Sequence, residues 1–85
     1  MKLKSKFASA VLNARKELGY TQHEVAEAVS VTSRWYQKIE AGMKLPGSLT
    51  LLRLILFLHL DVENFREEAG LVVPVSSVQK KHALR

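Results

Sequence analysis

Apolar and polar residues alternate with a helical period along much of the chain. Over residues 5–18, one apolar stripe faces a row of polar side chains, which predicts an amphipathic helix that buries one face. Ser5 is suited to cap the start of this helix, and Gly19 is suited to end it in a left-handed conformation. The stripe consists of Phe7, Val11, Ala14 and Leu18.

The next segment predicts two short helices joined by a tight turn. Thr21 and Glu24 have the spacing of a capping box, in which each side chain accepts a hydrogen bond from the backbone amide of the other residue. We therefore expect a helix over residues 22–29. Thr32 is a second candidate N-cap, and we expect it to open a helix over residues 32–41.

The second of these helices divides into two sides when its residues are placed at about 100° intervals. One side is polar and carries Ser33, Arg34, Gln37 and Lys38, and the other is bulky and carries Trp35, Tyr36 and Ile39. A short helix of this kind, held by a tight turn against a capped helix, is suited to the major groove of DNA. An ordinary amphipathic surface helix shows the same division, and this pattern by itself favours that simpler interpretation.

Two further helices are expected over residues 48–58 and 62–69, and the first of them is apolar on nearly every side. One stripe is suited to the core, and a second stripe exceeds what a small domain easily buries. We therefore predict a self-association surface, to which a residue of the last helix contributes. An alternative is that the tail folds back over the second stripe within one chain. The predicted surface consists of Leu52, Leu56, Leu60 and Phe65.

Length and composition indicate one small domain. The 85 residues are 47% hydrophobic, and we place the domain at residues 1–69 and a tail at 70–85 that is partly apolar and then basic. We expect this tail to be flexible or associated with the dimer. The chain has no cysteine, which excludes disulfides and thiolate zinc sites. Its most apolar run is too short to span a bilayer and its amino terminus lacks a signal core, so we expect a cytoplasmic protein that is not in a membrane.

The net charge of +5 is concentrated at the two ends of the chain. The residues between the two ends carry almost no net charge. A positive surface on the folded part therefore requires that basic and acidic side chains lie on different faces of the domain. The three histidines lack metal-ligand spacing, and no phosphate-binding loop or nucleophile motif is present, so we expect no enzyme, no metal and no cofactor. The end charges come from Lys2, Lys4, Lys6, Lys80, Lys81 and Arg85.

Several short motifs lie at set distances from one another along residues 15–54. They are Arg15, LGYTQ at 18–22, VA at 25–26, VT at 31–32, KIEAG at 38–42, Pro46 and TLLRL at 50–54. Together they resemble the helix-turn-helix domain of phage repressors and Cro proteins. The resemblance implies an all-α, compact five-helix, lambda-repressor-like domain. Its second and third helices would form the helix-turn-helix, and its third helix would read DNA.

The resemblance also implies roles for individual residues. It places base contacts at Ser33, Arg34 and Lys38, with Gln37 as a less regular contact. It places phosphate contacts at Gln22 and Thr32. Lys44, in the loop after the third helix, is also positioned to contact the DNA backbone. Arg15 and Glu40 match a pair that links the first and third helices, which we interpret as a structural ion pair.

Several residues depart from the family pattern, and three of these departures bear on the structure. Ser30 stands where a glycine is usual in the turn, so either serine takes a left-handed conformation or the turn differs. His59 replaces another glycine, and we interpret it as a cap of the fourth helix. Leu56 occupies a position that is often charged, which supports the predicted self-association.

These features predict sequence-specific binding of double-stranded DNA by a transcriptional regulator, more simply a repressor than an activator. Since one short helix contacts few base pairs, we expect a homodimer that reads an inverted repeat. The alternative is a protein-interaction module, such as an antitoxin-like protein that binds a partner, with DNA binding secondary.

Overall fold

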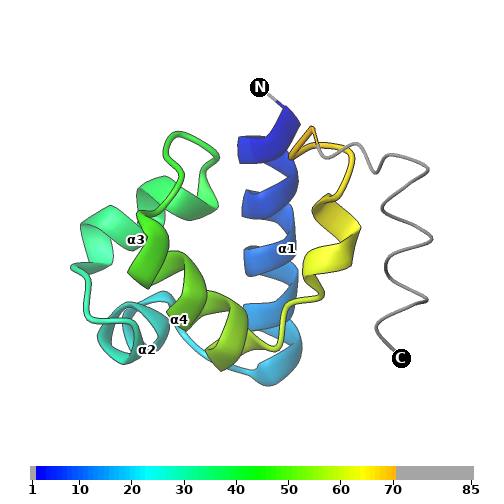
Figure 1. The fold of residues 1–85 in the computed structure, drawn as a ribbon. Coiled ribbons are helices and arrows are strands. Elements are labelled where there is room, and N and C mark those ends of the chain that lie inside the picture. Colours follow the sequence, from blue (N-terminus) through cyan, green and yellow to red (C-terminus); the bar gives the residue numbers. More distant parts are fainter. Residues whose placement is uncertain (1, 71–85) are drawn as a thin grey trace.

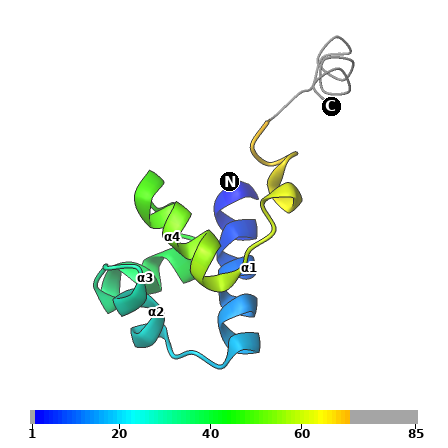
Figure 2. The same cartoon turned by 60° about the horizontal axis from the view of Figure 1, so that its bottom comes forward.

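Four α-helices and one short 3-10 helix make up the computed structural model, which describes residues 2–70 (Figure 1). The described part contains no β-strand, which confirms the all-α prediction. Two views place α2 and α3 on one side of α1 and the 3-10 helix on the other (Figures 1 and 2). The elements are α1 (Lys2–Leu18), α2 (Gln22–Ala28), α3 (Ser33–Glu40), α4 (Ser48–Leu58) and η1 (Val62–Phe65).

The prediction of a fifth α-helix over 62–69 is wrong. The structure has only the 3-10 helix η1, followed by turns to Gly70. The Asp61 carboxylate accepts a hydrogen bond from the Glu63 amide at 3.1 Å and caps the start of η1. A segment this short gains little from propagation after the costly first turn, so a tight turn positioned by Phe65 is favoured.

The first helix also begins earlier than predicted, at Lys2 and not at Ser5. Ser5 therefore lies within the helix and does not cap it. The other helix ends agree with the prediction to within about one residue, which is the ordinary uncertainty of helix boundaries.

Both predicted N-caps between α1 and α3 are confirmed. The Thr21 hydroxyl accepts from the Glu24 amide at 3.1 Å, and the Glu24 carboxylate accepts from the Thr21 amide at 2.8 Å. The Thr32 hydroxyl accepts from the Trp35 amide at 3.1 Å. These bonds fix the points at which α2 and α3 begin, because they satisfy amides that have no partner within the helix.

The core joins all four α-helices, and the bulky side of α3 lies within it. Tyr36 and Ile39 are fully buried together with Val11 of α1 and Leu54 of α4. Since these side chains are immobilised by packing, α3 is held with its opposite side toward solvent. The remaining core side chains are Phe7, Ala8, Val25, Ala26, Val29 and Leu58.

Within residues 2–70, two residues other than glycine adopt left-handed backbone conformations. Ser30, in the turn between α2 and α3, has φ of 62°, so serine keeps the conformation that usually favours glycine. His59 has φ of 56° and caps α4, which confirms its predicted role. The turn between α2 and α3 therefore keeps its shape without glycine, at the cost of backbone strain at Ser30.

Candidate nucleic-acid interface

The polar side of α3 faces away from the core. Arg34 and Gln37 are exposed, while Ser33 and Lys38 are half-buried. The opposite side carries the buried Tyr36. The structure therefore brings the four predicted base-contacting side chains onto one short helix, and it leaves them accessible.

A tight turn holds α3 against α2. Val29 is fully buried beneath the turn, and the Val31 amide donates to the Ala26 carbonyl at 3.0 Å. Val25 and Ala26 of α2 are buried as well. The two helices therefore form one packed unit, in which the position of α2 sets the direction of α3.

The Glu40 carboxylate, at the end of α3, joins three helices. It accepts from Arg15 Nε of α1 at 2.5 Å and from Arg15 Nη2 at 3.2 Å. It also accepts from Gln22 Nε2 of α2 at 2.9 Å and from the Tyr36 hydroxyl. The Arg15 and Glu40 side chains are only 13% and 5% exposed, so this ion pair is largely buried and contributes to the structure of the domain.

The protonation of these groups follows from their contacts. Burial alone would raise the pKa of Glu40, but the hydrogen bonds from Arg15, Tyr36 and Gln22 outweigh it and hold the pKa below its usual value. Burial raises the pKa of Tyr36, and its hydrogen bond to Glu40 raises it further. The hydrogen bond to Glu40 also raises the pKa of Arg15. At neutral pH the network therefore contains an ionised pair and a neutral tyrosine.

The predicted phosphate-contacting residues lie around the start of α2 and both ends of α3. Gln22 begins α2 and is held by Glu40, while one of its amide hydrogens is left for another acceptor. Thr32 is exposed at the start of α3, although its hydroxyl already accepts from a backbone amide. Lys44 is exposed in the loop between α3 and α4.

Three cations of this surface make no ion pair and no side-chain hydrogen bond to any other residue within 2–70. In contrast, Lys6 and Arg66, near η1, pair with Glu68 and Glu63. Lys4 and Lys16 of α1 and Arg53 of α4 also make no ion pair within residues 2–70, so unpaired cations occur elsewhere on the domain as well. The three of this surface lie on α3 or in the loop after it, where an anionic partner would neutralise them. They are Arg34, Lys38 and Lys44.

His23 is a residue of this surface that was missed from the sequence, because it was considered there only as a possible metal ligand. Its Nδ1 lies 2.8 Å from the Ser33 hydroxyl oxygen, and its Nε2 lies 3.8 Å from the Glu27 carboxylate. The contact orients the hydroxyl at the first turn of α3. The i, i+4 spacing to Glu27 was visible in the sequence, whereas the contact across the turn depends on the packing of α2 against α3.

The structure separates the residues that were predicted to mediate self-association. Leu52 and Leu56 of α4 are 53% and 66% exposed. Leu60 and Phe65 are half-buried and pack against the core, where the Phe65 ring centroid lies 5.8 Å from that of Phe7. Leu49 is 59% exposed and shares a helical stripe with Leu52 and Leu56, which its spacing would have indicated. We call these three leucines the α4 stripe.

The predicted tail, with its basic Lys80, Lys81 and Arg85, lies outside the described residues from position 71 onward. Within residues 2–70, no helix is both long and apolar enough to cross a membrane. The same residues contain no group of three or more potential metal ligands.

Comparison with known proteins agrees with the geometry of α2 and α3. The family model for the helix-turn-helix matches residues 11–65, which include α2, α3, the turn between them, α4 and the second half of α1. No curated protein and no solved structure matches the chain. The family match covers more than half of the 85 residues, and the chain therefore belongs to the helix-turn-helix family of the phage repressor and Cro type, a family of DNA-binding proteins.

Proposed function

We propose that this protein is a cytoplasmic transcriptional regulator that binds double-stranded DNA sequence-specifically through α3. One observation carries this proposal: Arg34, Lys38 and Lys44 have no partner within residues 2–70 and lie on α3 or in the loop after it. The other side of α3 is buried in the core. A cation without an internal partner is free to contact a base or a phosphate. A helix fixed by packing presents that cation in one orientation, which sequence-specific recognition requires.

Arg34 and Lys38 are the principal base contacts in this proposal. A guanidinium engages O6 and N7 of guanine with two hydrogen bonds, and an ammonium reaches the same acceptors as a point charge. Gln37 and Ser33 extend the contacts along the same side of α3. Each good base contact contributes about 1–3 kcal/mol of discrimination.

Contacts to the phosphates would set the position of α3 in the groove. The free amide hydrogen of Gln22 is directed by Glu40, and Lys44 adds a charge in the loop after α3. Thr32 lies at the start of the same helix. Such contacts bind every sequence alike and fix the register in which bases are read.

Self-association through α4 would place two copies of α3 on one face of the duplex. The α4 stripe is accessible, and burial of a leucine side chain contributes about 1.5–3 kcal/mol. A two-fold dimer places its recognition helices about 34 Å apart and reads an inverted repeat. Repression by occlusion of a promoter requires nothing beyond this binding.

Selection of duplexes from a random pool tests the proposal, followed by affinity measurements on variants. Arg34→Ala with Lys38→Ala should reduce affinity for the selected duplex by at least tenfold. Lys6→Ala with Arg66→Ala is the matched control, because it removes the same charges from the side of α1 that carries η1. If the two double variants bind the selected duplex equally, α3 is not the reading helix.

Sedimentation tests the dimer separately. Leu56→Asp places a charge on the most exposed leucine of the α4 stripe and should convert a dimer to a monomer. Glu67→Ala, at an exposed residue, should leave the dimer intact. A wild-type protein that is monomeric at micromolar concentration contradicts self-association through α4.

The α4 stripe also favours a second candidate function. Three exposed leucines on one helix are equally suited to a different protein, as in an antitoxin-like module whose DNA binding is secondary. A monomeric wild type that selects no duplex from the random pool would favour this second function over the first.

A further inference from the structure

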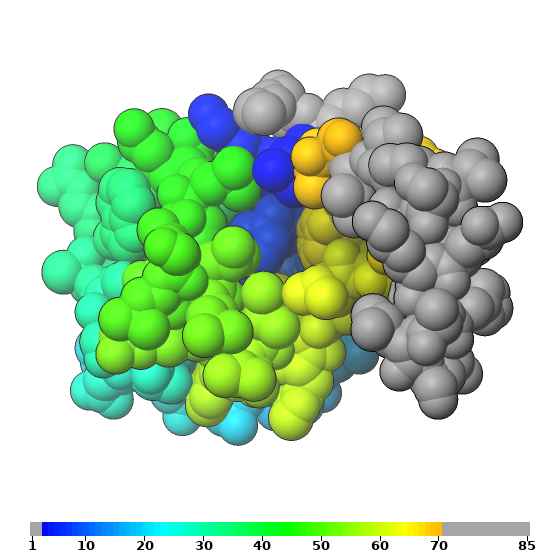
Figure 3. Space-filling model, in the orientation of Figure 1, coloured from blue at the N-terminus to red at the C-terminus, as the bar shows by residue number. Residues whose placement is uncertain are grey.

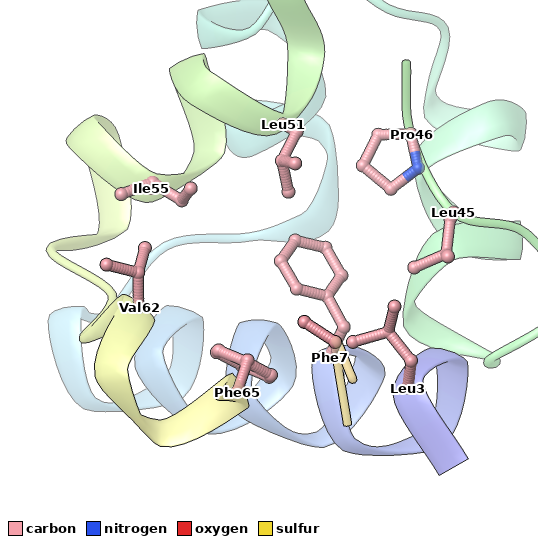
Figure 4. A pocket seen from close by; sticks show the side chains of 9 residues that line it. Leu3, Phe7, Leu45, Pro46, Leu51, Ile55, Val62 and Phe65 are labelled. Atoms are coloured by element: carbon pink, nitrogen blue, oxygen red, sulfur yellow. The ribbon is translucent and has the colours of Figure 1, made fainter. Parts of the chain in front are cut away.

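An apolar pocket of about 270 Å³ lies between α1, α4 and the segment after α4. Figure 3 shows the surface hollowed between α4 and residues 62–70, with α1 at the bottom of the hollow. In Figure 4, Leu51 and Ile55 of α4 lie across the pocket from Leu3 and Phe7 of α1, and Val62 lies at one end. Every described residue that lines the pocket is apolar.

The size and chemistry of the pocket favour aliphatic side chains as its occupant. A dry apolar cavity of about 150 Å³ accommodates one benzene molecule, so the present volume is suited to about two branched side chains. Water would find no polar partners on these walls. Val62, on the rim, is 52% exposed, so an occupant would remove further apolar surface from water.

The described part of the chain ends beside this pocket, and an apolar segment follows in the sequence. Ala69 is one of the lining residues, and the chain turns immediately after it, because Gly70 has φ of 74° and its amide donates to the Glu67 carbonyl at 3.0 Å. The five residues that follow, 71–75, read LVVPV and are all apolar. Five extended residues reach about 17 Å.

We propose that residues 71–75 of the same chain dock in this pocket in an extended conformation. Pro74 disfavours a helix here and restricts Val73 to extended backbone angles. In an extended segment alternate side chains share one side. We therefore place Leu71 and Val73 in the pocket, with Val75 on the same side beyond them and Val72 facing away.

The pocket could be occupied by residues 71–75 of the same chain or by those of a second copy. Attachment to the same chain favours the first. A short flexible connection gives an effective concentration in the millimolar range. At micromolar protein concentration, the attached segment is therefore favoured about a thousandfold. The pocket is lined by Leu51 and Ile55 and not by Leu52 or Leu56, so docking leaves the α4 stripe accessible, and the inference does not depend on the proposed function.

Paramagnetic broadening in NMR spectra of the full chain tests the docking. The chain contains no cysteine, so Ser77→Cys provides a single site for a nitroxide label. The label should broaden the methyl signals of Leu51 and Ile55 more than those of Val25 in α2. This broadening should be lost with Val73→Asp and kept with Val72→Asp, its matched control on the other side of the segment.

Three results would overturn the proposal: no selective broadening in the labelled chain, equal broadening in the Val73→Asp variant, or broadening that requires a second chain. The last is detected by mixing isotope-labelled chains without nitroxide with unlabelled chains that carry it. Unchanged core signals from Val11 show that each variant is folded. If Val73→Asp unfolds the domain, Val73→Ser replaces it in the same comparison.

Discussion

Replacement of Glu40 by alanine should strongly destabilise the domain, because it removes an acceptor that three side chains use. The Arg15 guanidinium, 13% exposed, would lose its counter-ion, and removal of one partner of such a buried pair costs about 3–5 kcal/mol. The buried Tyr36 hydroxyl would lose its acceptor at the same time, at about 1–3 kcal/mol. Since coupled losses are not additive, we expect about 3–5 kcal/mol in total.

Urea unfolding followed by circular dichroism measures this loss directly. Domains of this kind have about 5–15 kcal/mol of stability, with small ones near the lower limit, so the variant should be partly unfolded without urea. Glu63→Ala is the control, because its ion pair with Arg66 is largely exposed and contributes at most about 1 kcal/mol.

Simultaneous replacement of Arg15 and Glu40 by methionine separates the ion pair from simple loss of packing. Removal of both charges leaves no unpaired ion, and apolar residues of similar size often replace a buried pair with little loss. The double variant should therefore be more stable than the Glu40→Met single variant. A cost below about 1 kcal/mol for Glu40→Ala, or equal costs for these two methionine variants, would refute the assigned importance of the ion pair.

Three further predictions follow from local features. The pKa of Glu40 lies below its usual 4.5 in the folded chain. Its stabilising contribution is therefore complete above about pH 4.5 and is lost as the pH falls through the pKa of the folded state. The free energy of unfolding, measured over this acid range, should show the loss in the wild type and not in Glu40→Gln. Ser30→Gly relieves about 1–2 kcal/mol of left-handed strain and costs about 0.5–1 kcal/mol of backbone entropy. Urea unfolding should therefore show a gain of up to about 1.5 kcal/mol in the free energy of unfolding, and a loss would contradict the strain. His23→Ala should weaken binding to the selected duplex about two- to tenfold through loss of one hydrogen bond to Ser33, with unchanged thermal unfolding, whereas unchanged affinity would show that His23 does not position Ser33.

The sequence predicts best those features that depend on neighbouring residues. The Thr21 capping box and the Thr32 cap are local hydrogen-bond patterns, and both are present at the predicted positions. The two sides of α3 follow from helical geometry alone. The Arg15–Glu40 contact is different, because only the family resemblance indicated that residues so far apart in sequence would meet.

Features that depend on how helices pack could not be predicted in this way. The contact of Gln22 with Glu40 and that of His23 with Ser33 both cross between helices, and no local spacing marks them. The sequence after Asp61 is compatible with an α-helix, but the structure has only the 3-10 helix η1, in which Phe65 contacts Phe7 of α1. Leu52 and Leu60 belong to one stripe in the sequence, whereas the end of α4 at Leu58 places them in different surroundings.

The fold and the proposed DNA contacts depend on the same helix, which limits how independently they can vary. Glu40 ends α3, fixes Arg15 of α1 and also directs the amide of Gln22, a proposed phosphate contact. A change in this network therefore alters the placement of α3 together with the position of a phosphate contact. Because phosphate contacts set the register in which bases are read, the ion pair would link the stability of the core to the alignment of Arg34 with its proposed base.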